Sequence, residues 1–123
     1  MTKIAIVGPI HVDGRSILEK NSCDVFEITD FLSDNLIEKL QDVDGIALRT
    51  TKLTEDILKK CHKLKIVARH GVGYDNVDLN YLNKHKIALA ITGTSNAVSV
   101  AEHVMTMFLN ICKKSNLSDQ LVR

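Results

Sequence analysis

The sequence predicts an α/β domain built on an open, parallel, five-stranded sheet with helices on both faces. Short apolar, β-branched runs recur at nearly equal intervals, and they begin near Lys3, Asp24, Gly45, Leu64 and Ile87. Polar stretches with helical spacing separate these runs, as expected when helices form right-handed crossovers between parallel strands. The chain then changes character, because residues 100–113 form one long apolar stretch with helical spacing.

The runs differ in a way that predicts the order of the strands. Ile4–Val7, Ile46–Leu48 and Ile66–Ala68 are near-continuous apolar runs, which the central strands of a parallel sheet require because helices cover both faces. Asp24–Ile28 alternates between polar and apolar residues, as an edge strand does. We therefore expect the strand order 2-1-3-4-5, with the second strand at an edge.

Four predicted helices lie between the strands. Three residues that commonly cap helices, Ser33, Thr54 and Asp78, precede the second, third and fourth of them, and their side chains can accept hydrogen bonds from first-turn amides. The apolar positions of the four helices are Ile17 and Leu18, then Leu36, Ile37 and Leu40, then Ile57, Leu58 and Cys61, and finally Leu79 and Leu82.

The end of the chain predicts a long helix from Val100 to Lys113. Ser99 and Glu102 have the spacing of a capping box, which would start the helix at this point. Apolar residues lie on more than one side of it, so the helix needs cover on more than one side. Ser115–Asn116 predicts the end of this helix, and a second helix is expected from Leu117 onward.

Composition excludes several classes of protein. The 123 residues are 45% hydrophobic and 25% charged with a net charge of +1, which calls for neither nucleic acid nor a membrane surface as partner. The three cysteines, Cys23, Cys61 and Cys112, contain no Cys-x-x-Cys pair, so a disulfide framework or zinc site is not expected. No apolar stretch approaches the ~20 residues of a membrane span, and the first run is too short for a signal peptide. We therefore expect a cytoplasmic protein.

The carboxyl ends of the predicted strands mark the candidate site, because ligands of open parallel sheets bind there. Arg49 and Arg69 follow the third and fourth strands, and the loop His70–Gly73 has glycines at alternate positions. Glycines let backbone amides approach a ligand, and arginine offers planar paired donors to a carboxylate or phosphate. The pattern predicts a small-anion site that suits a carboxylic acid. In the alternative interpretation, the arginines pair with local acids such as Asp75 or Asp78.

Other nucleotide and phosphate sites lack their motifs. The loop has Asn76 where a dinucleotide fingerprint needs its third glycine, and no Walker sequence occurs. A phosphoacceptor receiver would need acids after the first strand, aspartate after the third and lysine after the fifth. Gly8–Pro9, Arg49 and Thr92 stand there, and Gly8–Pro9 also excludes the Ser/Thr-rich phosphate loop of a flavodoxin that binds FMN.

The histidines do not identify a catalytic base. His11 and His70 lie nearest the predicted site, but nothing in the sequence marks either as a general base. Glu102 and His103 are neighbours on the long helix, where consecutive side chains point in different directions, so we interpret this pair as structural.

Three stretches together resemble the D-isomer-specific 2-hydroxyacid dehydrogenase family: Leu48–Thr54, Ala68–Asp78 and Asn96–His103. They occur in the family's order and spacing, and they look most like the branch that acts on 3-phosphoglycerate in serine biosynthesis, although relatives that act on glyoxylate, hydroxypyruvate, lactate or formate share these motifs. In this family a flavodoxin-like substrate domain is interrupted in sequence by a Rossmann domain, and a long helix links the two. The resemblance implies a substrate-binding domain over residues 1–96, and a linker helix with the start of an NAD-binding domain over residues 97–123.

The resemblance also implies roles for individual residues. Arg49 would contact the substrate, and the amides of His70, Gly71, Val72 and Gly73 would hold its carboxylate. Val72 would also border the nicotinamide of NAD, and Asn96, Ser99 and Val100 would lie beside the cofactor. On position alone, Arg69 at the same predicted edge would give the site a second cation, which suits a doubly anionic acid such as phosphoglycerate.

The catalytic arginine, glutamate and histidine of the family have no match in these 123 residues, and neither does its glycine-rich NAD turn. We therefore expect the chain not to transfer hydride between NAD and the 2-carbon by itself. The resemblance implies that the whole enzyme is a homodimer. The alternative is a free-standing flavodoxin-like module that binds small acids or dimerises without catalysis.

Overall fold

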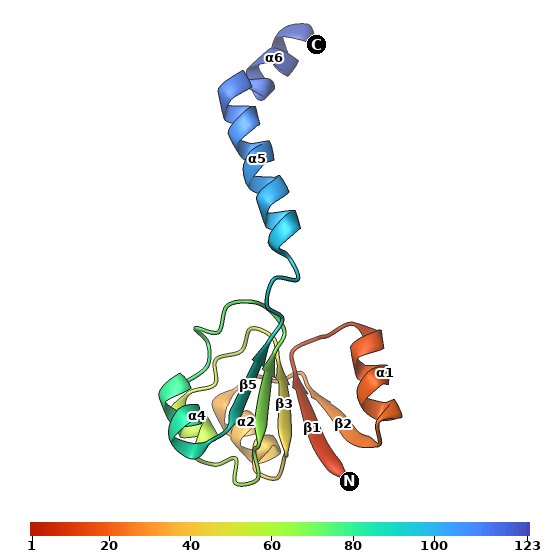
Figure 1. Cartoon of the computed structure of the whole chain (residues 1–123), viewed down its shortest axis with the longest axis vertical. Coiled ribbons are helices and arrows are strands. Elements are labelled where there is room, and N and C mark those ends of the chain that lie inside the picture. The colour runs from red at the N-terminus through yellow and green to blue at the C-terminus, as the bar shows by residue number, and fades with distance from the viewer. The chain divides into compact units, whose positions relative to one another are not determined.

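The computed structural model describes all 123 residues and divides them into two compact units, Met1–Gly93 and Thr94–Arg123. The first unit alternates strands and helices, and the second is helical (Figure 1). The elements in order are β1 (Thr2–Val7), α1 (Val12–Lys20), β2 (Cys23–Ile28), α2 (Ser33–Leu40), β3 (Gly45–Leu48), α3 (Glu55–Leu58), β4 (Ile66–Arg69), α4 (Leu79–His85), β5 (Ala88–Ile91), α5 (Ala97–Lys113) and α6 (Ser115–Val122).

The five strands form one sheet in the order β2-β1-β3-β4-β5, and every neighbouring pair is parallel. This confirms the fold class and the predicted strand order, including the edge position of β2. Because the strands are parallel, the carboxyl ends of β1, β3, β4 and β5 open onto a common edge of the sheet. The loops that follow these strands are therefore brought together there.

One face of the sheet carries the hydrophobic core. Val7, Ile46, Leu48 and Val67 are almost completely buried on this face. Apolar side chains of α2, α3 and α4 complete the cluster. Because each large side chain that leaves water contributes about 1.5–3 kcal/mol, this face supplies most of the stability of the first unit. Its buried helical members are Leu36, Leu40, Ile57, Leu58 and Leu82.

The opposite face carries a row of small side chains. Strand pairing places Ala47, Ala68 and Ala90 side by side on β3, β4 and β5. Together with Gly14 of α1 they line a shallow groove of about 310 Å³. Ala68 and Ala90 are exposed, because α1 packs beside β2 at the other end of the sheet (Figure 1).

The helix starts confirm one of the three predicted caps. Asp78 caps α4, with its carboxylate accepting a hydrogen bond from the Tyr81 amide at 2.9 Å. Thr54 stands at the predicted N-cap of α3, but its side chain makes no capping bond. The prediction for Ser33 was wrong, because α2 begins at Ser33 itself after Leu32. The Asp30 carboxylate accepts from the Leu32 amide at 3.1 Å and shapes that turn instead.

The second unit differs from the prediction at the start of its long helix. Helix α5 begins at Ala97, so Ser99 lies inside the first turn and the predicted capping box is wrong. The helix ends at Lys113 as predicted, Lys114 follows it in a left-handed conformation with φ of 49°, and α6 begins at Ser115 rather than at Leu117. No side chain of α5 or α6 is buried. None of the helices combines the length and apolar character that a membrane span requires.

The three cysteines are free thiols in different surroundings. Cys61 is buried, and its Sγ donates to the Ile57 carbonyl at 3.4 Å. This burial raises the pKa of the Cys61 thiol to about 11, which keeps it protonated and unreactive at neutral pH. Cys23 is half-buried and Cys112 is exposed.

Asp44 joins three strands at the amino edge of the sheet. Its carboxylate accepts from the Lys3 amide at 3.0 Å and from the Lys65 ammonium at 2.7 Å. Its backbone is bonded to the same two residues, with Asp44 N donating to Lys3 O and Lys65 N to Asp44 O, both at 2.9 Å. The amide of Lys3, and then the ammonium of Lys65, hold the pKa of Asp44 below its ordinary value of 3.8.

We expect Asp44→Asn to destabilise the protein at pH 7 and to lose this effect in acid. Because the folded-state pKa of Asp44 is depressed, its carboxylate contributes stability that is fully present above pH ~4 and is lost as the pH falls through the folded value. Urea unfolding at pH 7 and near pH 3 measures the difference between the native and variant chains. A difference of the same size at both pH values would contradict the prediction.

Candidate functional site

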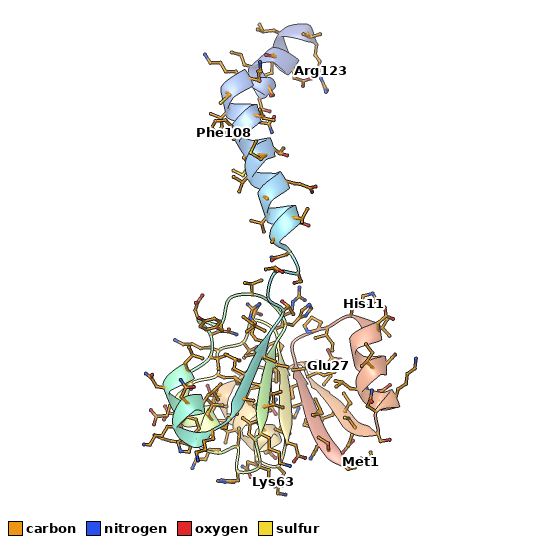
Figure 2. All side chains as sticks on the ribbon, in the orientation of Figure 1. Met1, His11, Glu27, Lys63, Phe108 and Arg123 are labelled. Carbon is orange, nitrogen blue, oxygen red and sulfur yellow. The ribbon has the colours of Figure 1, made fainter.

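The candidate site lies where the loops after β1, β3, β4 and β5 meet, at the carboxyl edge of the sheet. Figure 2 shows His11, which follows β1, at this edge, with Met1 and Lys63 at the opposite edge. The segment after β3 starts at Arg49, the segment after β4 runs from His70 to Asp78, and Thr92–Gly93 follow β5.

Backbone and side-chain bonds tie the segment after β3 to the loop after β4. Asn76 Nδ2 donates to Thr51 O at 2.8 Å. Leu53 N donates to Asn76 O at 2.8 Å, and Asp78 N donates to Leu53 O at 3.2 Å. Leu53 and Val77 form a parallel bridge and are both buried. The two segments therefore form one cross-linked surface and hold the site in shape.

Two of the four loop amides expected to face a ligand are used by the protein itself. His70 N donates to Leu48 O at 2.7 Å, and Gly71 N donates to Arg69 O at 3.0 Å. The amides of Val72 and Gly73 donate to no protein acceptor, and both residues are exposed. Two amides are therefore available to a ligand, and not the four of the sequence prediction, because those of His70 and Gly71 donate to backbone carbonyls of the protein.

The direction of the Val72 amide follows from a bond on the other side of the same peptide. Thr92 N, just after β5, donates to Gly71 O at 3.1 Å. The chain contains no cis peptide bond, and in a trans peptide the carbonyl and the N–H point in opposite directions. Anchoring Gly71 O on Thr92 therefore turns the Val72 N–H away from β5 and leaves it free for a ligand.

Arg49 lies at the start of the segment after β3 and is exposed. Its amide donates to Val7 O at 3.0 Å, and its Nη1 donates to Pro9 O at 3.3 Å. Gly8 makes this approach possible, because a Cβ at that position would lie 3.1 Å from Arg49 Cβ and its φ is +93°. Arg49 thus links the turns after β1 and β3. Its guanidinium makes only one hydrogen bond, to the neutral Pro9 carbonyl.

Neither arginine of the edge forms an ion pair. The alternative in which Arg49 and Arg69 pair with Asp75 or Asp78 is therefore not what the structure shows, since Asp78 caps α4 instead. Arg69 turns back on its own loop, with Nη1 donating to His70 O at 2.9 Å, while its Nε is buried without a partner. Arg49 is thus the cation of this edge with free donors, and Arg69 is engaged locally.

Both histidines near the edge are exposed. His11 caps α1, where its Nδ1 accepts from the Asp13 amide at 3.3 Å and lies 3.2 Å from the Asp13 carboxylate. His70 is exposed, and both histidines line the alanine groove with Arg69. No three His, Cys, Asp or Glu side chains gather as a metal site would require. Glu102 and His103 are exposed on α5.

The predicted cofactor residues are divided between the two units. Val72 belongs to the first unit and is 41% exposed. Asn96 precedes α5 in the second unit, and Ser99 and Val100 lie exposed in its first turn. A dinucleotide site needs a glycine turn that opens onto a free helix N-terminus. After β1 the chain has Gly8–Pro9, and His11 caps the following helix, so this chain does not form such a cradle.

Comparison with known proteins gives a family match over most of the chain. Residues 4–116 match the catalytic domain of the D-isomer specific 2-hydroxyacid dehydrogenases. The D-3-phosphoglycerate dehydrogenase of Methanocaldococcus jannaschii is 36% identical over 110 residues, which cover 89% of this chain and 21% of that protein.

Solved structures give the same result. An NAD⁺-bound 3-phosphoglycerate dehydrogenase of Entamoeba histolytica is 34% identical with a TM-score of 0.77, covering 89% of this chain and 38% of its own. The NAD-dependent formate dehydrogenase of Staphylococcus aureus is 26% identical with a TM-score of 0.81, covering 97% of this chain and 41% of its own.

The fold and the family match identify the chain with the catalytic domain of a family of oxidoreductases. The chain belongs to the D-isomer specific 2-hydroxyacid dehydrogenase family. It spans 21–23% of the length of the phosphoglycerate dehydrogenases among its curated relatives.

Proposed function

We propose that these residues form the substrate-binding part of an enzyme that transfers hydride between NAD and the 2-carbon of a D-2-hydroxy acid. The observation that carries the proposal is the pair of free, exposed amides at Val72 and Gly73, next to a segment that begins with an unpaired arginine, Arg49. Backbone amides and a guanidinium are the donors that hold carboxylates in proteins.

In this proposal the two amides hold the carboxylate and Arg49 binds the rest of the anion. A guanidinium has five N–H donors in a fixed fork, and Arg49 uses one of them on Pro9 at 3.3 Å. The donors that remain suit a carboxylate or phosphate oxygen. The cross-links through Asn76 and Leu53 keep the amides and the arginine segment from drifting apart, which lowers the entropic cost of binding.

We propose 3-phosphoglycerate as the preferred acid, which would place the whole enzyme in serine biosynthesis. The phosphoglycerate dehydrogenases of Methanocaldococcus jannaschii and Entamoeba histolytica, at 36% and 34% identity, support this choice over formate, whose dehydrogenase is 26% identical. The structure lowers the weight of Arg69 in this choice, since its guanidinium is turned onto His70 O. Arg49 would then face the second negative charge.

NAD would be held mainly by residues outside these 123. In this chain, Val72 presents an exposed apolar side chain beside the free amides, which suits the edge of a nicotinamide ring. We assign Asn96, Ser99 and Val100 to the cofactor side of the same enzyme, with residues 1–96 as the substrate domain and 97–123 as the linker helix.

We further propose that the whole enzyme is a homodimer in the cytoplasm. The free Cys61 and Cys112 thiols would stay reduced in that compartment.

We expect Arg49→Gln to weaken acid binding by about tenfold or more, the loss typical of one charge-assisted hydrogen bond. The ¹⁵N-labelled chain is titrated with 3-phosphoglycerate while the Val72 and Gly73 amide signals are followed. Arg15→Gln is the matched control, because Arg15 pairs with Glu19 on the surface of α1. Binding that leaves the Val72 and Gly73 signals unmoved would contradict the proposed site, and so would equal affinity in both variants.

A further inference from the structure

The backbone around His70 forms an unusually tight turn. Gly71 N donates to Arg69 O at 3.0 Å, an i to i+2 bond that defines a γ-turn centred on His70. His70 N donates to Leu48 O at 2.7 Å, which fixes the entry to the turn on β3. The turn ends where Gly71 O accepts from Thr92 N. The two free amides come directly after this point, so the turn decides where they lie.

The side chain of Arg69 adds a second hydrogen bond to the same turn. Arg69 Nη1 donates to His70 O at 2.9 Å, so the one peptide between His70 and Gly71 is held at both its N–H and its carbonyl by Arg69. Arg69 itself is anchored in β4, where it pairs with Ile91 of β5. Its side chain therefore transmits the position of the sheet to the loop.

Gly71 is the residue that permits this arrangement. A Cβ built on Gly71 would fall on Arg69 Nη1, and the guanidinium thus occupies the place of the missing side chain. Gly71 also has φ of +150°, which L side chains rarely adopt. The buried Arg69 Nε has no hydrogen-bond partner, so the guanidinium is held at some cost, by the loop bond and by packing over Gly71.

We propose that Arg69 is a positioning residue that holds the Val72 and Gly73 amides in line for the acid, and that it does not bind the acid's charge itself. The part of the inference that concerns acid binding rests on the proposed function. The part that concerns the geometry of the loop, called the structural half below, does not. Without the guanidinium, His70 O loses its donor and the turn is held by backbone bonds alone. The peptide planes that follow can then rotate, and the amide pair is no longer preorganised.

The structural half is tested on the chain without any ligand. Arg69→Gln is expected to shift the Val72 and Gly73 amide signals and to speed hydrogen exchange of the Gly71 amide by about tenfold. Arg15→Gln, a control arginine on α1, is expected to leave both unchanged.

Gly71→Ala is expected to lower the urea midpoint, and to lower it much less in a chain that already carries Arg69→Ala, because the displaced guanidinium is gone. Unchanged amide signals, or additive losses in the double variant, would overturn the proposal.

The ligand half separates positioning from direct contact. D-lactate carries one negative group and 3-phosphoglycerate carries a carboxylate and a phosphate. A positioning residue acts through the shared carboxylate, so Arg69→Gln is expected to weaken both acids by the same factor, and Arg69→Lys to restore part of the loss. A greater loss for 3-phosphoglycerate would show direct charge contact and overturn the proposal. If the native chain binds neither acid, the proposed function fails, while the amide shifts and the double variant still decide the role of Arg69.

Discussion

Leu48→Ala is expected to lower the free energy of unfolding by about 2–5 kcal/mol. Leu48 is completely buried at the end of β3, where it packs in the core cluster with side chains of α2, α3 and α4. Removing its branched side chain loses the transfer free energy of the buried carbons and leaves a cavity that the surrounding β-strands cannot close. For a domain of this size the loss is a large share of total stability.

Urea unfolding followed by circular dichroism measures this effect. Leu32→Ala is the matched control, because Leu32 is 71% exposed, and we expect its free energy of unfolding to stay within about 0.5 kcal/mol of the native chain. The backbone bond from His70 N to Leu48 O needs no leucine side chain, so the loop signals of the folded variant should stay close to native. Equal losses in the two leucine variants would contradict the assignment of the core to this face.

The second large effect concerns catalysis, and it follows from the proposed function. We expect the 123-residue chain to leave NADH unoxidised in the presence of hydroxypyruvate. Reduction of a 2-oxo acid consumes one hydride from NADH and one proton from a general acid. No glycine-rich dinucleotide turn occurs in the chain, and the Nδ1 of His11 is engaged at the start of α1, where it accepts from the Asp13 amide.

The absorbance of NADH at 340 nm gives the measurement, with a whole phosphoglycerate dehydrogenase as the positive control. The same sample of chain is also titrated with 3-phosphoglycerate, so that failure to fold is distinguished from failure to react. A rate that Arg49→Ala abolishes would refute the expectation, because it would show that the chain itself carries a complete active site.

The sheet could be predicted because the burial of each strand in the fold determines which residue types the strand can contain. Continuous apolar runs such as Ile46–Leu48 are stable only when covered on both sides, and the alternating Asp24–Ile28 suits an edge. The helix starts at Ser33 and Ser99 were missed because a side-chain cap is worth only about 1 kcal/mol. The helical preference of neighbouring residues can exceed that energy and start the helix one or three positions earlier than predicted, as Ala97 and Val98 do before Ser99.

The edge was predictable as a place, but its contacts were not. The positions of Arg49 and of the glycine loop follow from strand order, and the structure brings them to the same edge. The roles of the two arginines depend on rotamers that the sequence does not encode directly. The glycine at position 71 was the available signal, since a residue without a side chain leaves space that a neighbouring guanidinium can fill. Asn76, which cross-links the loops, carried no comparable signal.

The half-covered face of the sheet has a consequence for motion. Strand β5 pairs only with β4, and most of its side chains are exposed, so opening it costs less free energy than opening β1 or β3. Thr92, the residue after β5, holds Gly71 O and with it the direction of the Val72 amide. Fraying of this strand would release that bond before the core is disturbed. The alignment of the loop amides is therefore set by the least protected strand, and any element that covers β5 also steadies the loop.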